Sequence, residues 1–341
     1  MSLITAACRS LLTVISLFLA LWCAGPACAQ PPEMIRRLPP IVLEPTFTTD
    51  LSSPDPALRF ASDPTEYRTP EDVLPPDGPH LTSNKPGSFF QKLSLSGTQI
   101  FRDGSDGVGI TETELFAAFA LPAPTTESPL VLIPTLQMHF LDAPSFVNLP
   151  PRLYATYFDF MWLPRVSERL SGMVSVAPGW YSDFEGDDGF RLTGRGIARY
   201  DWIPDQLQLV LGVIYLGRLN SKIIPAAGLI WKPIDDLNFE LVFPRAKIGR
   251  RLSWGMGFEN WVYVAGGFGG NTWSIVTPGG GQDKLDMLDW RLMLGWEQKR
   301  NGGAGLLFEV GYVFARELEF ASTAAELKLD DTLLLRGGVM F

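Results

Sequence analysis

Three arginines lie four residues apart in the stretch 190–202, at Arg191, Arg195 and Arg199. Successive side chains of a β-strand point to opposite faces, so the three share one face of a strand, with Leu192 on the other. A lipid-facing arginine near the membrane midplane costs roughly 2–4 kcal/mol. We therefore expect this face to point into the lumen of a barrel, where a row of cations biases a channel toward anions.

Charged residues on the matching faces of other predicted strands would enter the same lumen. If the acids among them pair with the arginines, the lumen is a salt-bridged plug that conducts poorly. Because the opposing charges are numerous, pairing is the default expectation, and an open lumen is the alternative. Besides the three arginines, we predict that the pore-lining residues are Glu112, Glu114, His139, Asp159, Glu240, Asp289, Arg291, Glu309, Glu317, Glu319 and Arg336.

Catalysis has few candidate residues in this chain. The two histidines are His80 and His139, and a hydrolase would need one of them beside a nucleophile and a carboxylate. A single histidine on a lumen face is more often a hydrogen-bonded lining residue, so we predict no enzymatic activity. Two separated histidines also argue against a zinc site. We expect no cofactor.

An acidic turn at residues 182–189 contains four carboxylates, at Asp183, Glu185, Asp187 and Asp188. Calcium is bound by such oxygen ligands, but the turn lacks the twelve-residue spacing that ends in a bidentate glutamate. We therefore predict a solvated turn and no metal.

The elements that would position these residues are strands of alternating polarity, separated by short turns such as Asp103-Gly104 and Asn301-Gly302-Gly303. Most are longer than the five or six residues usual in soluble proteins, and they suit the roughly 9–11 residues of a tilted transmembrane strand. The predicted strands cover 91–102, 108–121, 130–140, 152–163, 169–181, 190–202, 207–218, 222–233, 237–251, 260–276, 284–298, 304–320 and 331–341.

Unbroken apolar rows on one face of several strands indicate contact with lipid. From Leu207 the row continues to Tyr215, and from Leu306 it continues to Phe314. Aromatic residues near strand ends favour interfacial girdles. On the strand 260–276, Trp261 and Trp273 share a face at a separation that spans the apolar band; the other girdle candidates are Trp162, Trp180, Tyr200, Trp202 and Trp231.

The strand count is the uncertain part of this pattern. Thirteen strands are predicted, whereas bacterial single-chain barrels have even numbers. The polar face changes parity at Phe243-Pro244-Arg245, where a proline bulge or an interrupted strand would explain the change. We predict an all-β, up-and-down antiparallel transmembrane β-barrel of about 12 strands, with 14 as the alternative.

The last ten residues, from Thr332 to Phe341, resemble the closing strand of bacterial outer-membrane barrels, which ends in phenylalanine and serves as an assembly signal. Leu333, Leu335 and Phe341 share the predicted lipid face, while Arg336 faces the lumen. We expect this strand to pair with the stretch 93–101, and the resemblance implies the barrel-assembly machinery as a partner.

The amino-terminal segment predicts export. Residues 1–29 have a signal-peptide pattern, with an apolar stretch and a small-x-small cleavage site between Ala29 and Gln30. All three cysteines lie before that site, so we expect the processed chain to contain none. Prolines crowd the stretch 30–88, which predicts a disordered linker before a barrel domain over 89–341.

Two further segments carry a family resemblance. The stretch 224–233, with the pattern Pro-x-x-Gly-x-x-Trp-x-Pro, and the following Phe243-Pro244-Arg245 resemble an uncharacterised family of bacterial outer-membrane β-barrel proteins, a domain of unknown function. The similarity covers about 90–341. It implies a barrel in the outer membrane, in contact with its lipid, and supplies no activity.

The predicted polar interior favours a porin-like or small-solute transport channel with a mixed-charge lumen. A non-conducting structural barrel that anchors the cell envelope is the alternative, and an outer-membrane hydrolase that uses His139 is a third hypothesis. The formal charge of −9 and the absence of a basic run exclude a nucleic-acid partner.

Overall fold

The computed structural model describes residues 89–341 except 105–106, 187, 220–221, 256 and 278–279. The predictions for the signal peptide, its cleavage site at Ala29 and Gln30, and the proline-rich linker lie outside the described residues. Within the described part of the chain, no helix is long and apolar enough to cross a membrane.

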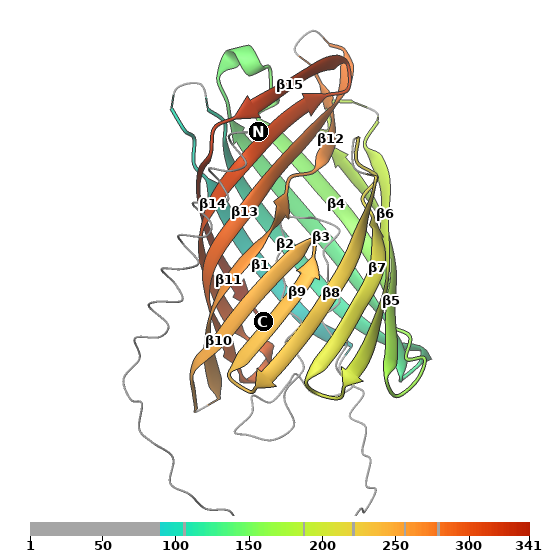
Figure 1. Ribbon diagram of the computed structural model, residues 1–341. Helices are drawn as coiled ribbons and strands as arrows, with labels where there is room; N and C mark the ends of the chain where they lie inside the picture. Colours follow the sequence, from blue (N-terminus) through green and yellow to red (C-terminus); the bar gives the residue numbers. More distant parts are fainter. Residues whose placement is uncertain (1–88, 105–106, 187, 220–221, 256, 278–279) are drawn as a thin grey trace, which may run out of the picture. The chain divides into compact units, whose positions relative to one another are not determined.

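Fourteen of the described strands close into one antiparallel barrel (Figure 1). Strands that follow one another in the wall pair as neighbours, and β16 pairs with β1 to complete the circle. The wall strands are β1 (Phe90–Ile100), β2 (Gly109–Thr125), β3 (Ser128–Asp142), β4 (Arg152–Trp162), β5 (Leu170–Ser182), β6 (Phe190–Ile203), β7 (Leu207–Tyr215), β8 (Ile223–Ile234), β9 (Leu237–Phe243), β10 (Arg245–Gly255), β11 (Phe258–Gly269), β13 (Gln282–Arg300), β14 (Gly305–Phe320) and β16 (Thr332–Met340).

Two short strands, β12 (Thr272–Val276) and β15 (Thr323–Leu329), are additions to this wall. Strand β15 pairs with the end of β14, and β12 pairs with the start of β13. Two short 3₁₀ segments, at Ser145–Val147 and Asn301–Gly303, lie in connections.

The main prediction of about 12 strands is wrong, and the alternative of 14 is correct. The predicted strand 237–251 is in fact a tight hairpin, in which Arg245 of β10 pairs with Val242 of β9. The chain reverses at Phe243-Pro244, because proline lacks the backbone N–H that a continuing strand would need. The parity change at this point therefore marked a reversal of the chain rather than a bulge.

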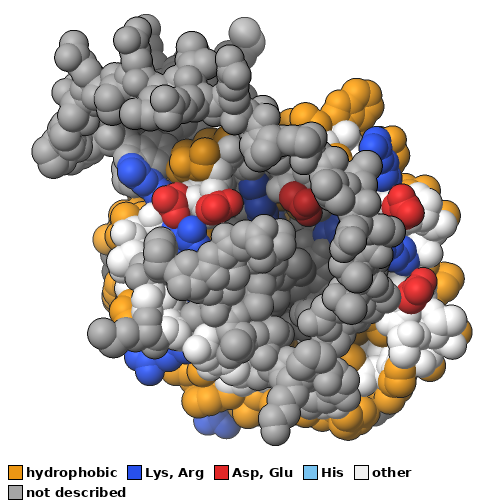
Figure 2. Space-filling model, turned by 90° about the horizontal axis from the view of Figure 1, so that it is seen from below, with side chains coloured by type: hydrophobic (Ala, Val, Ile, Leu, Met, Phe, Trp, Pro, Cys, Tyr) orange, Lys and Arg blue, Asp and Glu red, His pale blue; other side chains and the backbone are white. Residues whose placement is uncertain are grey.

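The outer face of the barrel is apolar, as the alternating pattern predicts. On β7, Leu211 is 70% exposed and Val213 is 56% exposed, while Val210 and Ile214, which flank them on the opposite face, are buried. On β14 the exposed row includes Leu306, and Figure 2 shows hydrophobic side chains around the outer circumference of the barrel. A surface of this kind is stable only in contact with another apolar phase.

Two predictions about side-chain direction are wrong. Trp261 and Trp273 do not belong to an interfacial girdle, because both are buried and the predicted strand 260–276 is divided into β11 and β12. On β14, the left-handed backbone at Ala315 shifts the parity, so that Arg316 is buried. Glu317 and Glu319 consequently lie on the other, more exposed face.

The closing strand pairs as predicted. Its residue Arg336 lies opposite Thr98 of β1, and the register continues from Ser94 to Ile100. Leu333 and Leu335 are exposed on the outer face, whereas Arg336 is buried on the inner face. The carboxy-terminal strand is therefore the element that closes the wall.

Fourteen strands make a wide barrel. Strands about 4.8 Å apart, tilted by about 40°, give a backbone cylinder roughly 28 Å across. Eight strands already enclose a space that side chains can fill, and 16 to 18 enclose an aqueous channel. The interior here is therefore wider than the one expected for 12 strands.

Two buried apolar clusters occupy separate parts of this interior. The first, called the side cluster here, comes mainly from β2 to β9 and includes Ile214, Ile230 and Phe268. The second, called the upper cluster here, comes mainly from β1 to β5 and β12 to β16 and includes Trp273 and Ile275. The sequence did not predict an interior with so much apolar surface.

Candidate functional site: the charged barrel interior

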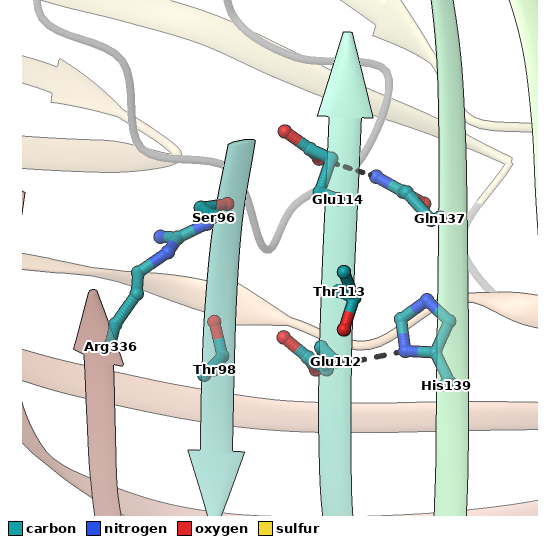
Figure 3. Close-up of a pocket in the computed structure, with 8 residues that line it drawn as sticks. All are labelled: Ser96, Thr98, Glu112, Thr113, Glu114, Gln137, His139 and Arg336. Atoms are coloured by element: carbon teal, nitrogen blue, oxygen red, sulfur yellow. Dashed lines mark hydrogen bonds and ion pairs between the residues drawn. The ribbon is translucent and has the colours of Figure 1, made fainter. Parts of the chain in front are cut away.

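A polar cavity lies on the inner surface of β1, β2, β3 and β16 (Figure 3). The volume of this cavity that the centre of a water molecule can occupy is about 10 Å³. The cavity therefore has room for about one water. Side chains from four neighbouring strands line it: Ser96, Thr98, Glu112, Thr113, Glu114, Gln137, His139 and Arg336. Four of the predicted pore-lining residues therefore meet at one place.

Arg291 connects this cavity to β13. Its guanidinium donates to Glu112 at 3.0 and 3.3 Å and to Asp289 at 2.6 and 3.0 Å. All three side chains are buried, so each charge has little access to water. Buried charges are tolerated when they are paired and hydrogen-bonded, and this arrangement satisfies both conditions.

His139 lies at the edge of the same network. Its Nδ1 is 3.9 Å from a carboxylate oxygen of Glu112, and its Nε2 has no hydrogen-bond partner. The imidazole makes an edge contact with the Trp273 ring, at 4.9 Å between centroids. Among the described residues, no hydroxyl group hydrogen-bonds to Nε2.

Three more ion pairs bridge strands of the interior. Arg195 donates to Asp159 at 2.6 Å, and Arg336 lies 3.5 Å from Glu309. Lys247 pairs with a glutamate of β13, Glu297, at 3.3 Å. These contacts match the paired form of the lumen that numerous opposing charges predict. Glu114 accepts a hydrogen bond from Gln137 at 2.7 Å, while Glu240 accepts one from Asn238.

The three predicted ladder arginines have different partners. Arg195 is paired with Asp159, whereas Arg199 donates to the Ser171 hydroxyl at 3.2 Å. Arg191 donates to the backbone carbonyl of Thr272 at 2.9 Å. The shared face is as predicted, but the row of cations is not a uniform positive strip along an open pore.

The contact of Arg191 belongs to a segment that leaves the wall. We name Gly270–Val276, which contains β12, the strap. It follows β11 and crosses to β5, where Ser274 forms a parallel bridge with Ser182. The chain can bend at Gly270 because its φ is +83° and a Cβ there would collide with the backbone of Met287.

The strap is bound by buried charged residues whose contacts the sequence did not indicate. Asp183 was predicted to lie in a solvated turn, but it is buried and accepts a hydrogen bond from the Val276 N–H at 2.7 Å. Arg218 is also buried and donates to the Gly270 carbonyl. Only its charge at the end of an apolar strand was visible in the sequence, and no local pattern indicated its partner.

Within the described part of the chain, no group of three or more His, Cys, Asp or Glu side chains is arranged to hold a metal ion. The acidic turn uses Asp183 to bind the strap, while Glu185 and Asp188 are exposed.

Comparisons with known proteins leave the family open. No family model matches the chain, and no curated protein matches it. The resemblance to the uncharacterised outer-membrane family therefore stays a prediction. A solved structure similar to this chain is the ΔS2S3 mutant of TodX, a monoaromatic hydrocarbon channel, with 9% sequence identity and a TM-score of 0.35 over 73% of this chain and 88% of that chain. A similarity this low carries no argument about function.

Proposed function

We propose that the protein is an outer-membrane channel through which small solutes cross the barrel. The observation that carries this proposal is that the two faces of one closed wall differ in polarity. The outer surface is apolar on all sides, and the inner surface holds buried charges from β2, β4, β6, β13, β14 and β16. A closed wall with lipid outside and polar groups inside is the architecture of a transmembrane β-barrel.

The width of the barrel supports transport over a purely structural role. A barrel with a backbone roughly 28 Å across is wider than one that needs only to fill itself with side chains. Smaller barrels satisfy an anchoring role with fewer strands. The charged groups also lie on strands of the wall, so movement of the strap would leave a polar surface along the interior.

The outer-membrane location is part of this proposal. It is supported by the apolar outer face, by the predicted export signal and by the closing strand that ends near Phe341. Purified folded protein should migrate differently on SDS gels before and after boiling, and it should fractionate with the outer membrane. Release from membranes without detergent would contradict this location.

The transport proposal is tested by inserting purified protein into planar lipid bilayers and by measuring solute uptake into liposomes. We expect discrete current steps and uptake of small polar solutes. The proposal is contradicted if the protein gives no current and no uptake although its heat-dependent gel shift shows that it is folded.

A non-conducting structural barrel is the second candidate. The observation that favours it is the extent of ion pairing, because Arg291, Arg195 and Arg336 all form ion pairs with buried carboxylates. This candidate predicts the silent outcome of the bilayer experiment in both the wild type and every strap variant.

A further inference from the structure

The strap divides the barrel interior. Because Ser274 bridges to Ser182, a second closed circuit of nine strands runs from β12 through β13, β14, β16 and β1 to β5. Phe268, two residues before the strap, belongs to the side cluster, while Trp273 and Ile275 of the strap belong to the upper cluster. The chain therefore passes from the side cluster to the upper cluster at the strap.

Polar contacts hold the strap to the far wall. The backbone N–H of Asp183 donates to the Ser274 carbonyl at 3.3 Å, and its carboxylate accepts from Val276. Arg191 donates to the Thr272 carbonyl and to the Asn271 side chain, and Arg218 donates to the Gly270 carbonyl. In the ranges that the structure describes, the backbone of the strap is joined to β5 by a single bridge, at Ser274.

This mode of attachment differs from that of the wall. Wall strands are joined by ladders of many backbone pairs; β2 and β1, for example, pair from Phe90 to Ile100. On its side toward β13 the strap has such a ladder, from Thr272 to Val276, whereas its polar contacts with the opposite side come mostly from charged side chains that bind its backbone. Side-chain contacts of this kind can be exchanged for water or solute groups without breaking the barrel.

We propose that the strap is a gate in the interior of the barrel, held closed by Arg191, Arg218 and Asp183. In the closed state Trp273 contacts His139, beside the polar cavity. Release of the strap from β5 and β6 would join the two parts of the interior and widen the path for solute. This inference rests on the proposed transport function.

The gate is tested by weakening the contact of the strap with β6. Arg191→Ala removes two hydrogen bonds from a charged donor, each worth about 1.5–3 kcal/mol. If loss of one such bond sets the scale, the open probability in planar bilayers rises roughly 10- to 100-fold. Arg102→Ala is the control, because it also removes an arginine, but one whose partner is the exposed Asp142 rather than a residue of the strap.

A reversible lock separates a gating effect from general loosening. In the full-length chain, a variant with R191A, S182C and S274C places two cysteines at paired positions, and the native cysteines all precede the predicted cleavage site. Oxidation should return the open probability to the wild-type value or below, and dithiothreitol should restore the R191A value. Wild type, S182C and S274C treated in the same way should not respond.

The outcomes distinguish the two proposals. If wild type conducts but R191A and the oxidised lock leave its open probability unchanged, the gate is refuted and transport stands. If neither wild type nor R191A conducts although both are folded, transport and the gate fail together. A rise with R191A that the disulfide reverses supports both.

Discussion

Replacement of Arg291 by methionine gives the sharpest test of the interior network. Methionine keeps much of the side-chain volume but removes four hydrogen bonds, two to Glu112 and two to Asp289. Both carboxylates would stay buried without their cation. Removal of one partner from a buried ion pair costs about 3–5 kcal/mol, and we expect a loss of this size in the free energy of unfolding.

The assay is urea unfolding of the barrel in detergent micelles, followed by tryptophan fluorescence. With a slope of about 3 kcal/mol per molar urea, the unfolding midpoint should fall by roughly 1–2 M. A triple variant, R291M with E112Q and D289N, removes the unpaired charges and should recover part of the loss. Arg102→Met is the control, because Arg102 pairs with the exposed Asp142 and such pairs contribute about 0–1 kcal/mol.

Two results would refute this reasoning. A midpoint for R291M within the range of the R102M control would mean that the charges are solvated in the barrel. Failure of the triple variant to exceed R291M in stability would mean that the loss comes from packing of the long side chain rather than from unpaired carboxylates.

Three other predictions follow from the same structure. Leu211→Arg, on the most exposed part of β7, should destabilise the barrel in lipid by about 2–4 kcal/mol, and Val213→Leu should not; equal folding yields in liposomes would contradict a lipid-facing β7. The purified protein should show no esterase activity above background, and His139→Ala should not change this; esterase activity that the substitution abolishes would revive the hydrolase hypothesis. In the β14–β15 extension, burial and then the nearby Asp286 and Glu326 raise the pKa of Glu319. The folded extension therefore binds protons more readily than the unfolded chain, so its stability should increase as the pH falls through that raised pKa. The protection factors of the β15 amides, which are corrected for the intrinsic pH dependence of hydrogen exchange, should rise on acidification, and less so in Glu319→Gln; unchanged protection factors would contradict this.

Alternation of polarity determined much of the fold before any tertiary contact was known. Eleven of the thirteen predicted strands correspond to single wall strands, since a lipid-facing side and an interior side force opposite polarity on neighbouring residues. The side-chain directions of the closing strand followed for the same reason, because Arg336 could lie only on the inner face. Local sequence therefore specifies both the strands and the direction of most side chains.

The remaining features depend on contacts that a period of two does not encode. The reversal at Phe243-Pro244 and the bend at Gly270 are single-residue events that alternation records only as a change of parity or not at all. The partner of Arg191 lies 81 residues away at Thr272, and that of Arg291 lies 179 residues away at Glu112.

The sequence by itself determined that this chain forms a barrel wall with a charged inner face. Only the tertiary structure decided which of these charges pair with one another and that a strap from Gly270 to Val276 reaches β5. The physical reason is that the alternation of polar and apolar residues along a strand depends only on what its two faces contact, lipid on one side and the interior on the other. This alternation is therefore visible in the local sequence. Pairing across a lumen depends instead on strand number, tilt and register, and these are properties of the closed barrel as a whole.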